Sequence, residues 1–155
     1  MTDRAIDPHL TRLEFLELGV DDYAVFPDIG QVVERDGPMA LDALYARIAA
    51  TPAVSRHFST DKAMDHARQK QLSHWRMLFS GPPGPEYFAR AEQVGAIHAQ
   101  IGLEPTWHIS AYSLVLEAMI TAIVGRTRLG GLFGKHTGWT IAALVKAALL
   151  DMDGA

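Results

Sequence analysis

Cysteine is absent from this sequence of 155 residues. Its absence excludes a disulfide framework, a thiolate metal site and a cysteine nucleophile. An excess of positive charge is absent as well, because 14 lysines and arginines stand against 18 aspartates and glutamates, for a formal net charge of −4. Without a basic patch, little in the chain attracts a phosphate backbone or an anionic lipid surface. We therefore expect no nucleic acid and no membrane among the partners.

Long apolar runs are scarce too. The longest stretch, residues 141–150, is interrupted by Lys146 and is shorter than the roughly 20 residues that a membrane-spanning helix requires. The first residues, Met-Thr-Asp-Arg, lack the basic segment and the apolar segment of a signal peptide. The prediction is a cytoplasmic protein without a transmembrane segment.

Motifs for catalysis by side chains alone are missing. The chain has no His-Glu-x-x-His zinc spacing, no Gly-x-Ser-x-Gly elbow and no phosphate-binding glycine loop. Runs of β-branched residues are few, whereas alanine and leucine are frequent. With 48% hydrophobic and 21% charged residues, the composition is typical of one globular, mainly helical domain.

Apolar residues recur at helical spacing along most of the chain. Prolines, glycines and capping residues set the expected helix boundaries. Gly37-Pro38 is expected to separate two helices, and Thr127 to Gly138 is expected to form a loop. The predicted helices cover residues 7–19, 21–35, 39–50, 61–80, 105–126 and 139–152, with a single helical turn after Thr51. A further helix is expected between the linker at residues 81–85 and Gly102.

His98 is the main candidate for a chemical role. It continues an apolar stripe that runs through Tyr87, Ala91 and Val94 to Ile101, so its imidazole is expected to face the interior. A glycine and a proline directly after this stripe predict a tight corner between two helices. The histidine is either a core residue bonded to a carbonyl oxygen or an axial ligand of a haem iron, and spacing alone does not distinguish these interpretations.

Three motifs carry a resemblance to a known family. Residues 98–112, HAQIGLEPTWHISAY, resemble the proximal segment of bacterial globin-coupled sensors, the haem sensor domains related to protoglobins. Residues 42–45, DALY, resemble their distal tyrosine segment, and residues 74–81, HWRMLFSG, resemble the end of their E helix. The order of the motifs and the helix-sized spacing between them agree with that family.

The resemblance implies an all-α globin fold with an extra N-terminal helix, no D helix, and haem b between the E and F helices. It implies that His98 is the proximal iron ligand. It also implies that Tyr45, on the opposite face, donates a hydrogen bond to the bound gas; without the resemblance, Tyr45 would be interpreted as a core tyrosine. The other residues expected to contact the haem are Phe58, Ala67, Lys70, Gln71, Val94, Ile101, Trp107 and Tyr112.

The chain departs from the family pattern at three positions. Lys70 replaces a small hydroxyl residue that touches the ligand in some members, and it is expected to be solvated or to reach a haem propionate. Ala67 replaces a leucine and leaves extra room above the iron. His108 replaces an aromatic residue that follows the tryptophan, which changes the expected hydrogen bonds on the proximal side.

The function that the resemblance implies is reversible binding of oxygen, with CO and NO as further ligands. Residues 1–155 would form one non-enzymatic sensor domain that signals to an output domain beyond residue 155, such as a diguanylate cyclase or a histidine kinase. The last two helices carry more apolar surface than one core face requires, so we expect a homodimer through residues 109–124 and 139–152.

Two alternatives belong to other classes of protein. One is a haem enzyme that acts on NO or peroxide, for which the available distal polar groups are Tyr45, Lys70, Gln71 and His74. The other is a haem-free globin-fold interaction module, in which His98 is only a packed residue.

Overall fold

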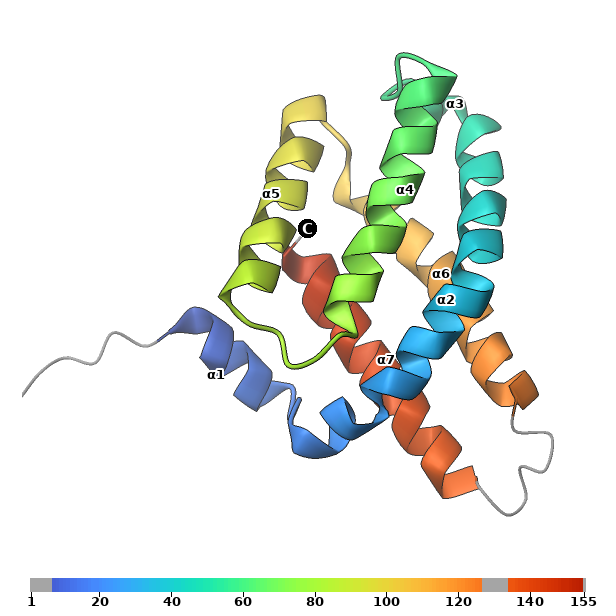
Figure 1. Ribbon diagram of the computed structural model, residues 1–155. Coiled ribbons are helices and arrows are strands. Elements are labelled where there is room, and N and C mark those ends of the chain that lie inside the picture. The colour runs from blue at the N-terminus through green and yellow to red at the C-terminus, as the bar shows by residue number, and fades with distance from the viewer. Residues whose placement is uncertain (1–6, 127–133, 155) are drawn as a thin grey trace, which may run out of the picture.

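The computed structural model describes residues 7–126 and 134–154. Within these residues the chain forms seven α-helices and no strand (Figure 1). The helices are α1 (Pro8–Phe15), α2 (Val20–Ala49), α3 (Pro52–Ser55), α4 (Asp61–Leu78), α5 (Pro85–Ile101), α6 (Pro105–Arg126) and α7 (Gly134–Gly154). The all-α prediction is confirmed.

The α2 helix is continuous, so the predicted break at Gly37-Pro38 is wrong. Both Pro27 and Pro38 lie inside the helix. A proline in a helix interior costs about 3 kcal/mol, whereas burial of one large apolar side chain contributes about 1.5–3 kcal/mol. Because α2 packs along α4, α6 and α7, its burial outweighs both prolines. The buried residues of α2 are Val25, Phe26, Ile29, Val32, Val33, Gly37, Leu41 and Leu44.

Gly37 has a packing role at the contact between α2 and α4. A Cβ atom at this position would lie 3.1 Å from Cδ1 of Leu72 on α4. That distance is tighter than ordinary van der Waals contact, so the missing side chain lets the two helices approach closely. Gly37, which was expected to mark a helix boundary, therefore allows close packing of α2 against α4.

The corner between α5 and α6 has the predicted form. Gly102 is the C-cap of α5 with a left-handed φ of 74°, and the N–H of Leu103 donates to the carbonyl oxygen of His98 at 2.9 Å. Pro105 is the first residue of α6, where no amide donor is needed. Local backbone geometry thus fixes His98 in the last turn of α5.

Two other boundaries differ from the prediction. The α1 helix ends at Phe15, not at Gly19, because Glu17 adopts a positive φ of 53° before α2 begins. The α7 helix begins at Gly134, inside the predicted loop, while residues 127–133 of that loop lie outside the described residues.

The α6 helix has the length and hydropathy of a membrane-spanning helix, and it is the one helix of the described part of the chain that does. One side of α6 nevertheless lies in the core and packs against α2 and α7. The buried residues of α6 are Tyr112, Val115, Met119 and Ile123. Core helices of soluble proteins meet the same length and hydropathy limits, so this composition is compatible with a globular fold.

Candidate functional site

A cavity of about 470 Å³ lies between α2, α4, α5 and α6, and its volume falls within the range of roughly 300–1,000 Å³ that is usual for small-molecule sites. Its lining is mainly apolar, with a few polar groups between apolar side chains. All ten predicted site residues line it: Tyr45, Phe58, Ala67, Lys70, Gln71, Val94, His98, Ile101, Trp107 and Tyr112.

His98 and Tyr45 reach the cavity from different sides. His98 is half-buried in the last turn of α5, and Tyr45 comes from the C-terminal half of α2. These helices lie on the two sides of α4 (Figure 1). One imidazole and one phenol therefore contribute to the same cavity from separate helices.

The Tyr45 phenol is kept protonated by its surroundings. Burial raises its pKa to about 12, although the nearby Arg68 guanidinium acts in the opposite direction. The ring packs edge-on against Phe58, with 6.2 Å between the ring centroids. At neutral pH the hydroxyl is therefore a hydrogen-bond donor held by an aromatic neighbour.

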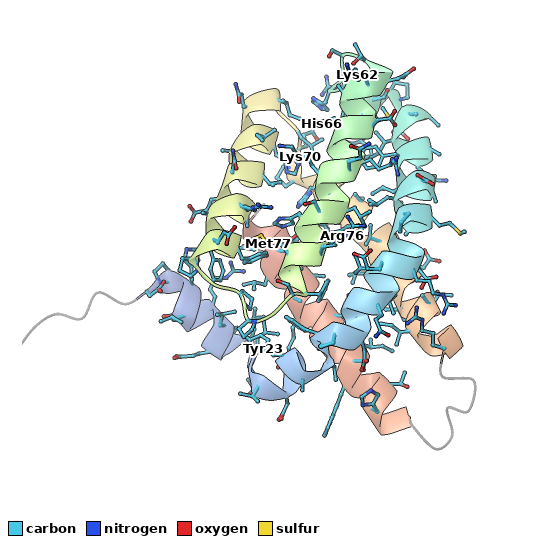
Figure 2. The ribbon with its side chains drawn as sticks, in the orientation of Figure 1. Tyr23, Lys62, His66, Lys70, Arg76 and Met77 are labelled. Atoms are coloured by element: carbon cyan, nitrogen blue, oxygen red, sulfur yellow. The ribbon has the colours of Figure 1, made fainter. Side chains whose placement is uncertain are left out.

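The α4 helix supplies the long wall of the cavity. Ala67 and Gln71 are half-buried, whereas His66 and Lys70 line the cavity and remain exposed to solvent. Figure 2 labels His66 and Lys70 along this helix. The small side chain of Ala67 leaves space in the cavity, and the exposed pair lies at its edge.

His108, which was expected to change the hydrogen bonds on the proximal side and not to contact the haem, also lines the cavity. Its ring centroid lies 4.8 Å from that of His98, and its buried Nε2 has no hydrogen-bond partner among the described residues. Burial and the neighbouring His98 lower the pKa of His108 to about 4, against an opposing effect of Asp151. The imidazole is therefore uncharged at neutral pH, with one buried nitrogen available to a ligand.

His57 is a second such residue. It also lines the cavity, and its buried Nε2 lacks a hydrogen-bond partner within the described chain. It follows the short α3 helix, where a single turn provides too little periodicity to predict a buried side.

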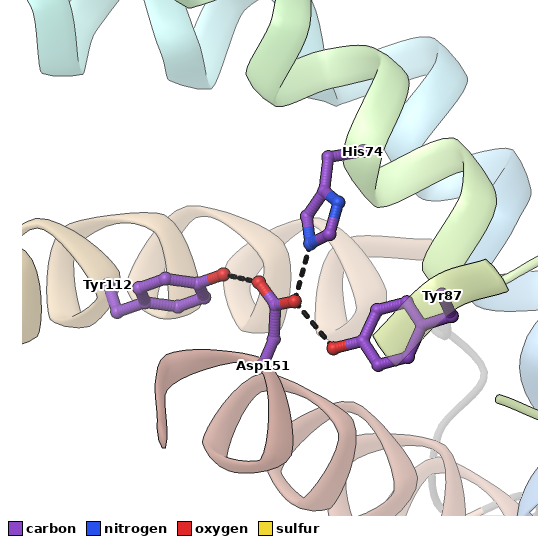
Figure 3. A network of polar contacts seen from close by, with 4 residues as sticks. All are labelled: His74, Tyr87, Tyr112 and Asp151. Atoms are coloured by element: carbon purple, nitrogen blue, oxygen red, sulfur yellow. Dashed lines mark hydrogen bonds and ion pairs between the residues drawn. The ribbon is translucent and has the colours of Figure 1, made fainter. Parts of the chain in front are cut away.

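Asp151 forms the centre of a buried polar cluster (Figure 3). This residue of α7 is 1% exposed. Its Oδ1 accepts a hydrogen bond from the Tyr87 hydroxyl and lies 2.5 Å from Nε2 of His74, and its Oδ2 accepts from the Tyr112 hydroxyl. An ionised carboxylate only accepts hydrogen bonds, so the His74 tautomer with its proton on Nε2 matches this contact.

The Asp151 cluster connects four helices, because its members come from α4, α5, α6 and α7. Burial and the Asp151 carboxylate both raise the pKa of Tyr87, which keeps that phenol a donor. His74 and Tyr112 also line the cavity. Hydrogen bonds to Asp151 therefore connect these two lining residues to α7.

The sequence contains a signal for this cluster. Asp151 continues the buried stripe of α7 that includes Leu144, Ala147 and Ala148. A carboxylate in line with a core stripe needs buried partners. The sequence-based prediction considered only the extra apolar surface of this helix and did not use Asp151.

We expect Asp151→Ala to lower the free energy of unfolding by about 3–5 kcal/mol, because three buried donors would lose their acceptor. Denaturation by urea measures the change. Asp153→Ala is the matched control, since Asp153 is exposed and its one ion pair among the described residues is with Arg12. Its loss should cost less than about 1 kcal/mol. Equal effects of the two substitutions would show that the cluster contributes nothing beyond a surface ion pair.

Comparison with known proteins agrees with this geometry. A sequence model of the Protoglobin family matches residues 9–155. The fold is similar to that of the globin domain of the Geobacter sulfurreducens globin-coupled sensor, with a TM-score of 0.84 and 14% sequence identity over 94% of this chain and 93% of that chain. At this identity the likeness establishes the globin fold alone. Because the family match spans nearly the whole sequence, this chain belongs to the Protoglobin family.

Proposed function

We propose that this chain is a haem-based gas-sensor domain that binds oxygen reversibly, with CO and NO as further ligands. Membership of a globin family implies haem. The observation that carries the proposal is that His98 and Tyr45 line one apolar cavity of about 470 Å³. An absorption spectrum of the ferrous protein with and without oxygen tests it, because a Soret band that shifts reversibly is the expected result.

The residues of the cavity fit a haem b group. Haem, when bound, would supply an iron that takes a nitrogen ligand from the protein and binds a diatomic gas. His98 would hold the iron, and Phe58, Val94, Ile101 and Trp107 would cover the apolar porphyrin. The unpartnered Nε2 atoms of two other cavity histidines, described above, also indicate a cavity shaped for a ligand that is not part of the chain.

Tyr45 supplies the polar group that distinguishes one gas from another. Its protonated hydroxyl lies in a site of low polarity, where a hydrogen bond is stronger than in water. Ala67 on α4 leaves room for a ligand in the same cavity. The chain can therefore admit a small gas and donate one hydrogen bond to it.

A sensor also needs a connection from the cavity to other parts of the protein. His108 lies against His98 and, with 5.1 Å between ring centroids, against Tyr112, whose hydroxyl donates to Asp151 on α7. A small displacement of the His98 imidazole would shift His108 and Tyr112, and through them the contact with Asp151. We infer that residues 1–155 relay the state of the cavity through α7 to an output domain, such as a diguanylate cyclase or a histidine kinase.

Two results would favour another function. If haem-supplemented protein shows no Soret band, the haem-free interaction module is the favoured function. Turnover of NO or peroxide above that of free haem would favour the haem enzyme. The polar groups expected for it, Tyr45, Lys70, Gln71 and His74, all line the cavity.

We expect His98→Ala to abolish stable haem binding, because the protein then lacks its nitrogen ligand and only apolar and ionic contacts remain. The Soret band after gel filtration measures the retained haem, and added imidazole should restore it. His136→Ala is the control, since His136 is exposed on α7 outside the cavity lining. Full retention in His98→Ala without imidazole would assign the iron to another nitrogen.

We expect Tyr45→Phe to raise the oxygen dissociation rate about tenfold or more, since a charge-assisted hydrogen bond contributes roughly 1.5–3 kcal/mol. CO dissociation should change far less, because bound CO is nearly apolar. Stopped-flow ligand replacement measures both rates. Tyr23→Phe serves as the control, since its hydroxyl bonds the carbonyl oxygen of Leu18. An unchanged oxygen rate in the Tyr45 variant would remove this phenol from the mechanism.

We also propose a homodimer through residues 109–124 and 139–152. The α6 and α7 helices pack together, and each keeps large apolar side chains exposed. The exposed fractions are 53% for Ile109, 51% for Val124, 58% for Trp139 and 46% for Leu149. A second copy that supplies the same two helices would cover this surface in a four-helix arrangement.

Light scattering of the haem-loaded protein at micromolar concentration should therefore give the mass of a dimer. The double substitution Val124→Glu and Leu149→Glu should give a monomer that retains haem. Phe15→Glu, on α1, is the matched control because this apolar side chain is also exposed. A monomeric wild type, or a dimer that survives the double substitution, would contradict the proposed interface.

A further inference from the structure

The cavity lining contains no carboxylate among the described residues, although aspartate and glutamate outnumber lysine and arginine in the chain. Its cationic side chains are Arg47 and Lys70. Several other cations pair with carboxylates, as Arg68 does with Asp42 at 3.0 Å. Neither Arg47 nor Lys70 forms an ion pair within the described part of the chain. The cavity is therefore suited to an apolar ligand that carries negative charge.

The α4 helix places two of the basic lining residues together. His66 and Lys70 are one helical turn apart, so their side chains share one side of α4. Both are exposed, which puts them at the edge of the cavity and not in its interior.

The α5 helix contributes exposed apolar residues to the same lining. Ile97 is 50% exposed and Ile101 is 41% exposed, and both line the cavity. An exposed isoleucine pair on a cavity wall is explained if the ligand covers it. A ligand in this position would place apolar surface against α5 and its charged end near the exposed pair of α4.

We propose that Lys70 and His66 bind the carboxylates of the cavity ligand. This inference rests on the proposed function, because haem b carries two propionate carboxylates beside an apolar ring. The Lys70 ammonium supplies positive charge, and His66 supplies an N–H donor one turn away. The pair would fix which edge of the porphyrin lies at the mouth of the cavity.

The pair is preferred to Arg47 for a geometric reason. Two donors on one helical stripe can converge on a carboxylate group, whereas Arg47 is the one strongly basic group that α2 contributes to the described lining. Because both α4 side chains are exposed, water and salt screen their attraction. The expected effects on haem release are therefore modest and depend on ionic strength.

The test compares haem with haem dimethyl ester, in which both carboxylates are blocked. The rate of transfer from the loaded protein to an excess of a haem-scavenging globin is measured at low and high salt. With haem at low salt, Lys70→Gln and His66→Ala should each release the group about two- to fivefold faster, and Lys70→Glu up to about tenfold faster. With the ester, all three should match the wild type. High salt should reduce the differences.

Lys62→Glu is the control, since Lys62 is exposed on the same helix outside the described cavity lining. It should leave both release rates unchanged. Equal effects of the Lys70 substitutions on haem and ester, no effect on haem, or the charge dependence appearing instead in Arg47→Gln would overturn the inference while the proposed function stands. A wild type that binds neither porphyrin would overturn both.

Discussion

The buried Asp151 carboxylate imposes the strictest physical constraint on this fold. An unpaired buried charge costs several kcal/mol, and here α4, α5 and α6 each bring one donor to it. These donors meet at one point only if the four helices keep their relative positions. Because His74 and Tyr112 also line the cavity, the geometry of the cavity wall and the position of α7 depend on the same contacts.

The cavity itself depends on unequal packing around α4. The α4 helix packs extensively on α2, whereas its contact with α5 is limited. The continuous α2 helix extends far enough to bring Tyr45 to one side, and the α5–α6 corner brings His98 to another. Space therefore remains between helices that are held at the Asp151 cluster, and the cavity is a consequence of the bundle and not of a flexible loop.

The sequence predicted those features that depend on neighbouring residues. Gly102 and Pro105 act over a few positions, so the corner after His98 was predicted correctly. The family resemblance supplied the ten predicted site residues, and all ten line the cavity. The continuity of α2 was missed because a proline's cost is local, while the packing that outweighs it comes from distant helices. The partners of Asp151 are 39, 64 and 77 residues away in the chain, which no local pattern reveals.

Uncharged and charged side chains of the cavity lining lie in different places. His108, with its pKa lowered to about 4, and Tyr45, with its pKa raised to about 12, are both uncharged in the interior at neutral pH. Tyr45 is therefore a neutral hydrogen-bond donor in the cavity, although the Arg68 guanidinium is close enough to act on its pKa. The cation Lys70 lies instead at the exposed edge, where solvent screens its effect on the interior. In the proposed sensor, residues at the edge would hold the ligand group, and the uncharged residues inside would face the gas.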